Sequence, residues 1–239
     1  MKIERRQTLT AILLMVLIVL VDQCIKIYIK THFVLHESVK VTSWFYLSFV
    51  ENNGMAYGVE LGSKTMLTIF RIVAVAAFLW VLFRKINHKC AWSFVVLMSM
   101  IISGAVGNII DSVFYGQWFT SSVGRVAQWA DASVGLMPQA DWFNGRVVDM
   151  FYFPLIDFDW PSWVPTMGET VHCIVDFEWP RWLPCSDEPF RFFEPVFNFA
   201  DASISVGVAL LLIYLVVESR KEAKAEAKAK GQSESADHA

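Results

Sequence analysis

Four long apolar runs constrain this chain more than any other feature of its sequence. They lie at about residues 8–29, 65–83, 91–111 and 198–217. Each has close to the roughly 20 residues that an α-helix needs to cross the hydrocarbon core of a bilayer. Because 55% of the 239 residues are hydrophobic, the composition also favours a membrane protein over a soluble domain. We therefore predict an integral membrane α-helical protein with four transmembrane helices.

The first run has the beginning of a cleavable signal peptide. It follows a basic start that contains Lys2, Arg5 and Arg6. However, no small-residue cleavage site follows it, and the bulky Gln23 before Cys24 makes a poor signal for lipid attachment. We expect this run to be a retained helix.

The positive charges predict how the chain is oriented. Short basic segments lie at the N-terminus, at 84–89 and after the fourth run. With four spans, all three segments fall on one side, which the positive-inside rule assigns to the cytoplasm. Both termini are then cytoplasmic, and the regions 31–64 and 112–196 are outside. We expect residues 1–218 to form a single membrane-embedded domain and 219–239 to form a charged cytoplasmic tail.

The two outer regions differ in composition. Residues 39–49 are rich in β-branched and aromatic side chains and are predicted to form a strand. Residues 51–58 are rich in turn formers, which on spacing alone is typical of an ordinary hairpin. Residues 112–196 hold seven of the ten tryptophans and all eight prolines, which suits a segment at the level of the lipid headgroups. We expect an enlarged outer loop region there.

Acids and amides gather at the outer ends of the predicted helices. A carboxylate at the mouth of a membrane helix is costly unless it is paired, hydrated or functional. Two neighbouring carboxylates would share one proton, and such a pair can activate water against a peptide carbonyl. Helix caps explain two or three of these residues but not the whole group. The group comprises Asp22, Asn52, Asn108, Asp111, Asp149, Asn198 and Asp201.

Other kinds of site have little support. The five histidines are scattered, which argues against Ser-His or Cys-His catalysis. The four cysteines have neither CxxC spacing nor nearby histidines, so no metal site is predicted. A net charge of −3 without a concentrated basic face argues against nucleic-acid binding. Whether Cys173 and Cys185, which share one outer region, form a disulfide is left open.

Two alternatives stand beside a peptidase. A small transporter or channel would use the same acids as an ion path, but it would spread them through the depth of the membrane. A membrane scaffold held by the tryptophan-rich region would leave the clustered amides and acids without a purpose. The small residues at 103–107 have a simpler role in close helix packing, which does not account for Asn108 or Asp111.

Five short motifs stand in order at the outer ends of the spans. They are Asp22-Gln23 with Lys26, then Asn52-Asn53-Gly54-Met55-Ala56-Tyr57, Gly104-Ala105-Val106-Gly107-Asn108-Ile109-Ile110-Asp111, Val147-Val148-Asp149 and Phe197-Asn198-Phe199-Ala200-Asp201. Together they resemble the motifs of the lipoprotein signal peptidase (signal peptidase II) family. The second resembles the family's Asn-x-Gly-Ala-Ala-Phe, with Met55 and Tyr57 as mild departures. The resemblance covers residues 8 to about 218.

The resemblance implies a fold, a reaction and a set of site residues. The fold would add a small extracytoplasmic β-cradle and a short helix to the four spans. The reaction would remove the signal peptide of a diacylglyceryl-modified prolipoprotein by cutting just before its lipid-bearing cysteine. The resemblance implies a catalytic pair, Asp149 and Asp201, in a monomer that contacts membrane lipid in the bacterial inner membrane, with no metal or other cofactor. The residues expected to bind substrate or support the pair are Asp22, Lys26, Asn52, Gly54, Asn108, Asp111, Arg146, Asn198 and Ala200.

The chain departs from the family pattern in two ways. The family usually has an arginine after the aspartate of the third motif, where this chain has Ser112. Arg146 or Arg125 are the candidates to replace it. The segments 112–146 and 152–195 are also longer than the family leads us to expect, and we predict that they form a lid over the site or dock a partner.

Overall fold

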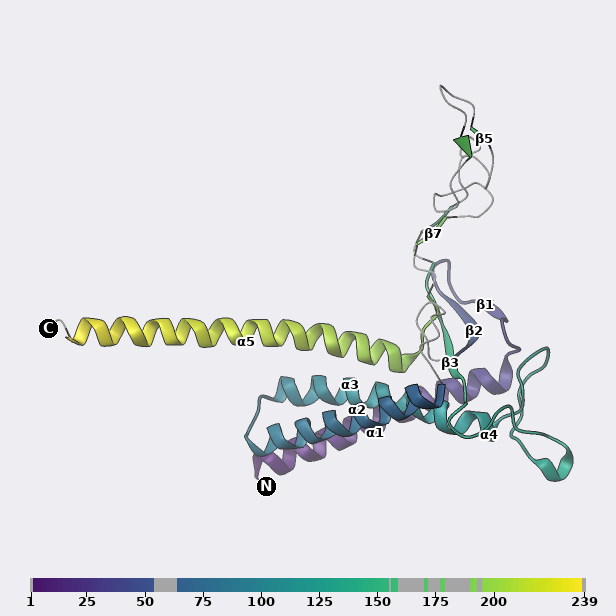
Figure 1. Cartoon of the computed structure of the whole chain (residues 1–239), viewed down its shortest axis with the longest axis horizontal. Coiled ribbons are helices and arrows are strands. Elements are labelled where there is room, and N and C mark those ends of the chain that lie inside the picture. The colour runs from purple at the N-terminus through teal and green to yellow at the C-terminus, as the bar shows by residue number, and fades with distance from the viewer. Residues whose placement is uncertain are drawn as a thin grey trace.

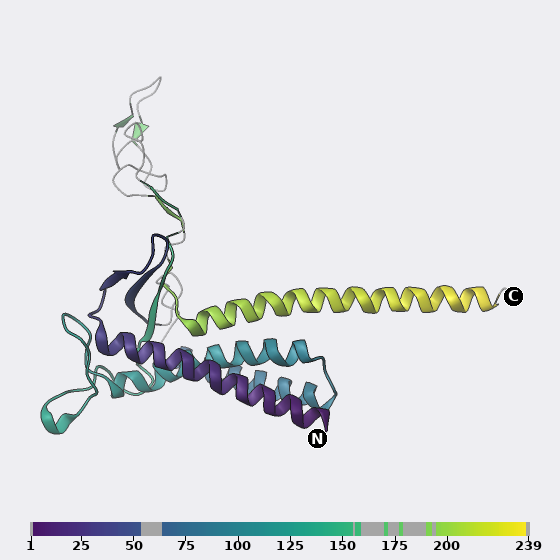
Figure 2. The same ribbon diagram turned by 180° about the vertical axis from the view of Figure 1, so that it is seen from behind.

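The computed structural model describes residues 2–53, 64–154, 156–158, 170–171, 177–178, 190–192 and 195–237. Figure 1 shows long helices that run alongside one another and a small sheet that stands at one end of them. Figure 2 shows the same arrangement from behind, with the sheet beside the start of the last helix. The sheet therefore lies at one end of the membrane-spanning part of the chain.

Within the part of the chain that the structure describes, four helices are long and apolar enough to cross a membrane, which confirms the predicted fold class. They include α1 (Ile3–His32) and α2 (Lys64–Asn87). The third, α3 (Trp92–Ile110), continues through a π-helical turn into the short α4 (Gly116–Trp118). The fourth, α5 (Phe199–Asp237), runs on through most of the charged tail.

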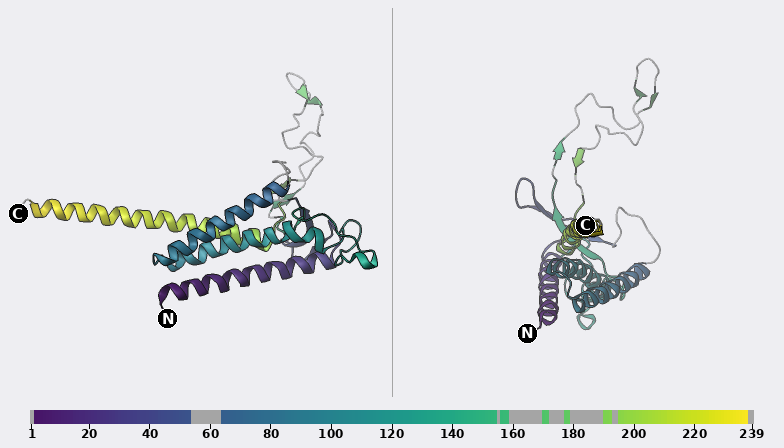
Figure 3. Two further views of the ribbon diagram at one scale, coloured as in Figure 1. Left: turned by 60° about the horizontal axis from the view of Figure 1, so that its bottom comes forward. Right: turned by 90° about the vertical axis from the view of Figure 1, so that its left-hand side faces the viewer.

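Helix α3 holds the bundle together because it packs against α1, α2 and α5. Figure 3 shows the four helices from two further sides. Half of the most apolar stretch of α3 is buried, whereas the corresponding stretches of the other three helices are mostly exposed. Exposed apolar faces suit helices that meet lipid. The buried residues between α1, α2 and α3 are Ala11, Val75, Leu82, Ile86, Val95, Met98, Ile101 and Ile102.

The sheet has three antiparallel strands in the order β1 (Ser38–Lys40), β2 (Tyr46–Asn52) and β3 (Val147–Tyr152). In β2 and β3, Val50 stands opposite Asp149 and Glu51 opposite Val148. Strand β3 thereby brings residues from far along the sequence next to the first outer region.

The stretch 39–49 is not the single strand that its composition predicts. It forms a hairpin in which β1 turns back on β2, and the backbone N–H groups of Val41 and Thr42 both donate to the Phe45 carbonyl at 3.0 Å. Strand β2 then continues through Asn52, into the stretch expected to be a turn. Propensity for extended backbone does not reveal where an extended segment reverses, and this is why the prediction missed the turn.

A second apolar cluster fixes the sheet to the ends of the helices. It joins the last turns of α1 to the segment that follows α3 and to the inner face of β2 and β3. Burial of this surface sets how deep the sheet sits, because each large side chain contributes roughly 1.5–3 kcal/mol when it is removed from water. The buried members are Ile29, Phe33, Phe49, Tyr115, Phe119, Ala127, Val148 and Met150.

Among the described residues between β3 and α5, two short ladders are present. Strand β4 (Ile156–Phe158) pairs with β7 (Phe190–Phe192), and β5 (Thr170–Val171) pairs with β6 (Phe177–Glu178). Gly54, Cys173 and Cys185 lie outside the described residues, so the predicted role of Gly54 and the open question of a disulfide are not addressed.

Candidate active site

The start of α5 holds Asp201 in a defined orientation. Asn198 precedes the helix, and its side-chain oxygen accepts a hydrogen bond from the Asp201 backbone N–H at 2.9 Å. In return, the Asn198 backbone N–H donates to Asp201 Oδ2 at 3.4 Å. This reciprocal pair has the pattern of a capping box. The other carboxylate oxygen, Oδ1, accepts from Asn108 Nδ2 at 2.7 Å, so both oxygens of Asp201 are oriented.

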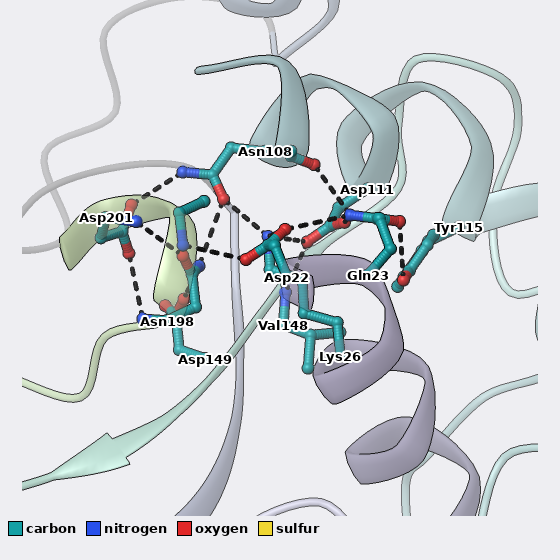
Figure 4. Close-up of polar contacts among 12 residues, drawn as sticks. Asp22, Gln23, Lys26, Asn108, Asp111, Tyr115, Val148, Asp149, Asn198 and Asp201 are labelled. Atoms are coloured by element: carbon teal, nitrogen blue, oxygen red, sulfur yellow. Dashed lines mark hydrogen bonds and ion pairs between the residues drawn. The ribbon is translucent and has the colours of Figure 1, made fainter. Parts of the chain in front are cut away.

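Asp149 reaches the same place from the sheet. It lies in β3, is buried, and its Oδ1 accepts from Asn198 Nδ2 at 2.6 Å. Burial and the nearby charge of Asp201 raise the pKa of Asp149 to about 7, although hydrogen bonds from Asn198 and Asn52 act in the opposite direction. The Asn198 side-chain amide thus bridges the Asp149 carboxyl group and the Asp201 backbone N–H (Figure 4).

Lys26 forms a second polar cluster beside this pair. Its ammonium group is fully buried and contacts Asp22 Oδ2 at 3.0 Å and Asp111 Oδ2 at 2.8 Å. The third contact is to Asn108 Oδ1 at 2.8 Å. Because an ammonium group has three N–H donors and no acceptor, these three contacts use its whole capacity. Gln23 adds hydrogen bonds to Asp22 at 3.1 Å and to Asp111 at 3.0 Å.

The two acids that flank Lys26 also hold the backbone next to each member of the pair. Asp111 Oδ2 accepts from the backbone N–H of Val148, the residue before Asp149, at 3.2 Å. Asp22 Oδ1 accepts from the backbone N–H of Ala200, the residue before Asp201, at 2.9 Å. Since Lys26 bridges both acids, one buried charge cluster sets the separation of β3 and α5 (Figure 4).

Two glycines of α3 make this close approach sterically possible. A Cβ atom at Gly107 would lie 2.6 Å from Asp22 Oδ2 and 3.2 Å from Ala200 Cβ. A Cβ atom at Gly104 would lie 2.4 Å from the Ala200 carbonyl oxygen. The close packing that the small residues at 103–107 predict is therefore present, and it is directed at the polar cluster.

The structure gathers most of the residues expected to form a site. Asp22, Asn108 and Asp111 meet around Lys26, while Asn198 and Asn52 contact Asp149. Ala200 is buried beside them and presents its backbone N–H.

The two arginines considered as substitutes for the family's arginine lie elsewhere. Arg146 contacts Glu51 Oε2 at 3.4 Å, and its side chain is 42% exposed. Arg125 is exposed. Ser112 itself is buried and donates to the Asn108 carbonyl at 2.9 Å. Among the described contacts of these residues, none brings either arginine to the Asp111 cluster.

Sequence reasoning missed several buried or half-buried polar partners. Gln23 was quoted in a motif without a role, and it accepts from the Tyr115 hydroxyl at 3.1 Å. Lys30 and Glu51 were missed altogether, yet they form a fully buried ion pair. A signal was present: Asp22, Lys26 and Lys30 recur every four residues along one face of α1, as buried residues of a helix do.

Chemically, the arrangement offers two carboxyl groups in unlike surroundings. The Asn198 side chain links their two residues, because it donates to the Asp149 carboxyl group and accepts from the Asp201 backbone N–H. Neighbouring carboxyl groups in general resist double ionisation, which favours a state in which one holds a proton and the other is a carboxylate. This is the state needed to activate a water molecule and protonate a carbonyl oxygen in one step.

Comparisons with known proteins place this geometry in a family. A family model described as signal peptidase (SPase) II matches residues 14–217. The lipoprotein signal peptidase of Porphyromonas gingivalis strain W83 is 48% identical over 196 residues, which cover 81% of this chain and 76% of that protein. The lipoprotein signal peptidase of Amoebophilus asiaticus is 31% identical over 200 residues, covering 79% of this chain and 70% of that protein.

Solved structures agree on the fold. A bacterial membrane enzyme superposes with a TM-score of 0.56 at 22% identity and covers 88% of this chain and 89% of its own. A second bacterial membrane enzyme superposes with a TM-score of 0.50 at 23% identity, covering 86% and 92%.

Proposed function

The chain belongs to the signal peptidase II family, and from this premise we propose that it is an aspartyl endopeptidase of the bacterial inner membrane. Its substrates are diacylglyceryl-modified prolipoproteins, which it cuts just before the lipid-bearing cysteine. Asp149 and Asp201 activate the water that attacks the scissile peptide bond. The observation that carries this proposal is the contact of both aspartates with the buried Asn198, through the carboxyl group of Asp149 and the backbone N–H of Asp201.

The surroundings of the two acids support different roles for them. Asp149 is buried in the sheet, and its raised pKa of about 7 keeps a substantial fraction of this carboxyl group protonated at neutral pH. Asp201 lies in the first turn of α5, where the helix dipole favours negative charge. It also accepts hydrogen bonds on both oxygens. Asp149 is thus the acid and Asp201 the base.

The reaction follows from these roles. Asp201 takes a proton from water as the water oxygen bonds to the scissile carbonyl carbon, and Asp149 gives its proton to the carbonyl oxygen. The tetrahedral intermediate then breaks its C–N bond. Asp201 returns its proton to the leaving nitrogen, which becomes the amino group of the lipid-bearing cysteine, and Asp149 regains a proton from the hydroxyl of the intermediate.

The amides around the pair act by positioning. Asn198 contacts both aspartates, and Asn108 donates to Asp201 while its oxygen faces Lys26. Preorganised groups of this kind lower a barrier because they need not reorient as charge moves during the reaction. Loss of either amide should therefore reduce kcat more than it weakens substrate binding.

The proposed orientation places the site at the outer face of the membrane and both termini in the cytoplasm. In support, Arg84 and Lys85 lie in the last turn of α2, whereas the polar clusters lie at the other end of the bundle, beside the sheet. The positive-inside rule then assigns the α2–α3 connection to the cytoplasm.

The proposal is tested with purified protein and a lipidated prolipoprotein. Asp149→Asn and Asp201→Asn should each abolish cleavage while the protein stays folded. Asp141→Asn, an exposed acid of the same outer region, is the matched control and should cleave like the wild type. The same prolipoprotein without its lipid should remain intact. Full activity in either dyad variant would overturn the assignment of the pair.

A further inference from the structure

A further buried polar network lies apart from both the aspartate pair and the Lys26 cluster. At its centre Lys30, near the end of α1, pairs with Glu51 of β2, and each side chain is only 1% exposed. Two residues from the segment after α4 complete it, Ser122 and Gln139. The three partners of Lys30 are 21 to 109 positions from it in sequence, so no local structure explains their meeting.

The network is closed on itself. Lys30 Nζ donates to Glu51, to Ser122 Oγ at 3.0 Å and to Gln139 Oε1 at 2.8 Å, which uses all three of its donors. Ser122 in turn donates to Glu51 Oε1 at 2.8 Å, and Gln139 Nε2 donates to Glu51 Oε2 at 2.6 Å. Arg146 adds a contact to the same oxygen at 3.4 Å. Lys30, Glu51, Ser122 and Gln139 are therefore each held by at least two of the others.

Stability alone is a weak reason for such a cluster. Desolvation of two buried charges cancels much of their attraction, so an apolar pair of similar volume is often at least as stable. What a closed network provides is one arrangement of its members. The question is which functional group depends on that arrangement.

The group that depends on it is Asn52, which follows Glu51 in β2. Neighbouring residues of a strand point to opposite faces, so Glu51 and Asn52 face away from each other. Asn52 bonds to the Asp149 side chain, and Glu51 is held by Lys30 on the other face. Glu51 stands opposite Val148 and Asn52 opposite Val147 in the β2–β3 register. The network thus fixes the end of β2 from the face opposite to Asn52. At this end β2 pairs with Val147 and Val148, the two residues that precede Asp149.

Arg146 strengthens this link because it comes directly before β3. Its contact with Glu51 ties the entrance of β3 to the same carboxylate that fixes β2. Both strands that present side chains to the site are therefore anchored at the Glu51 carboxylate. The lysine that pairs with this carboxylate, Lys30, belongs to α1.

We propose that Glu51 and Lys30 are positioning residues of the peptidase, which hold the end of β2 so that Asn52 stays in contact with Asp149. The inference rests on the proposed function, since it assigns these residues a task in that reaction. The alternative is a purely architectural role, in which the network only docks the segment 119–140 on the sheet.

The two roles differ in what they do to a folded enzyme. The hydrogen bond from Asn52 lowers the pKa of Asp149. If Asn52 moves away from Asp149, this pKa rises, and the fall of kcat/KM on the alkaline side of its pH profile begins at a higher pH. An architectural role changes how much protein folds but leaves the pH profile of the folded fraction where it was.

The test uses the full chain in detergent and the double variant Lys30→Met/Glu51→Gln. It removes both charges together, because Glu51→Gln alone would leave the Lys30 ammonium buried without a partner. We expect kcat/KM per folded molecule to fall on the order of 10- to 100-fold, as for a catalytic group displaced by about an ångström. The alkaline limb should shift to higher pH. The exposed pair Glu218 and Lys221, changed to Glu218→Gln/Lys221→Met, is the matched control and should change neither value.

A double-mutant cycle decides the route of the effect. Asn52→Ala should shift the alkaline limb in the same direction, and the triple variant should show no larger shift than Asn52→Ala alone. An unshifted limb in the double variant, or additive shifts in the triple variant, would overturn the proposal. A wild type that does not cleave the lipidated prolipoprotein would instead overturn the proposed function, so the two failures are distinguishable.

Discussion

Lys26 Nζ donates a hydrogen bond to Asn108 Oδ1 at 2.8 Å, and this contact decides which way the Asn108 amide faces. An ammonium group can only donate, so the amide oxygen must lie toward Lys26 and the NH2 group toward Asp201. Asp201 Oδ1 is then an acceptor, at 2.7 Å from Asn108 Nδ2. A buried lysine on α1 thereby fixes which atom of the Asn108 amide faces the Asp201 side chain on α5, although the lysine and Asp201 have no direct contact among the described bonds.

Removal of the Lys26 charge should unfold the site. In Lys26→Met, Asp22 and Asp111 would remain buried without their cation, which costs on the order of 3–5 kcal/mol. We expect a large drop in the thermal unfolding midpoint, measured by intrinsic fluorescence in detergent. Lys221→Met, at an exposed ion pair, should change the midpoint little.

A neutral triple variant separates charge from shape in this prediction. Asp22→Asn/Lys26→Met/Asp111→Asn keeps the side-chain volumes and leaves no buried charge unpaired. Its thermal unfolding midpoint should lie much closer to that of the wild type than the midpoint of Lys26→Met does. Cleavage should not return, because Lys26 no longer holds the Asn108 amide in its orientation. An equally low midpoint in this variant would contradict the electrostatic explanation.

Gly107→Ala should separate α1 and α5 from α3. The added Cβ atom would meet Asp22 Oδ2 at 2.6 Å and Ala200 Cβ at 3.2 Å, so the acid or the helix must move. Overpacking of this kind costs about 1–3 kcal/mol, and we expect a lower midpoint together with a loss of kcat larger than the change in KM. Gly207→Ala is the comparison variant, since its added Cβ would also press on α3, at 2.9 Å from Ile101 Cγ1 and 3.3 Å from the Leu97 carbonyl oxygen, but would meet none of the polar side chains of the site. Equal effects of the two changes would argue against a special role for the Gly107 contact.

Some parts of this molecule could be predicted from sequence and others could not. Apolar runs translate directly into membrane helices, and the polarity at their ends placed Asp22, Asn108, Asp111 and Asp201 at one depth. Asp149 stands in a strand reached only through a long outer segment, so the family motif was needed to single it out.

The Lys30–Glu51 network shows where such reasoning ends. Ser122 and Gln139 belong to irregular segments without periodicity, and nothing in the local sequence indicates that they meet a lysine of α1. The hairpin at 38–52 was missed for a related reason, because strand propensity is a property of composition whereas a turn is fixed by backbone contacts.

Asp149 should cost the protein stability at alkaline pH. Its pKa is about 7 in the folded protein, against about 3.9 in an unfolded chain. Between these values the folded state binds the proton that the unfolded state has released, so the free energy of unfolding falls as pH rises through this window. Asp149→Asn removes the effect, and the variant should therefore be more stable than the wild type at pH 8 but not at pH 4. Asp141→Asn should show no such crossover. Parallel stability curves for wild type and Asp149→Asn would contradict the raised pKa.

The same group predicts the alkaline limit of cleavage. If Asp149 must donate a proton to the carbonyl oxygen, the active fraction of enzyme declines once pH exceeds the pKa of about 7. Well above that pKa, kcat/KM should fall about tenfold for each further pH unit. The measurement is the initial rate of cleavage of a lipidated prolipoprotein from pH 5 to 9, at substrate concentrations below KM. Fluorescence at each pH verifies that the enzyme remains folded. A rate that stays level from pH 6 to 9 would show that Asp149 does not supply the proton, and the roles of the two aspartates would then have to be exchanged or abandoned.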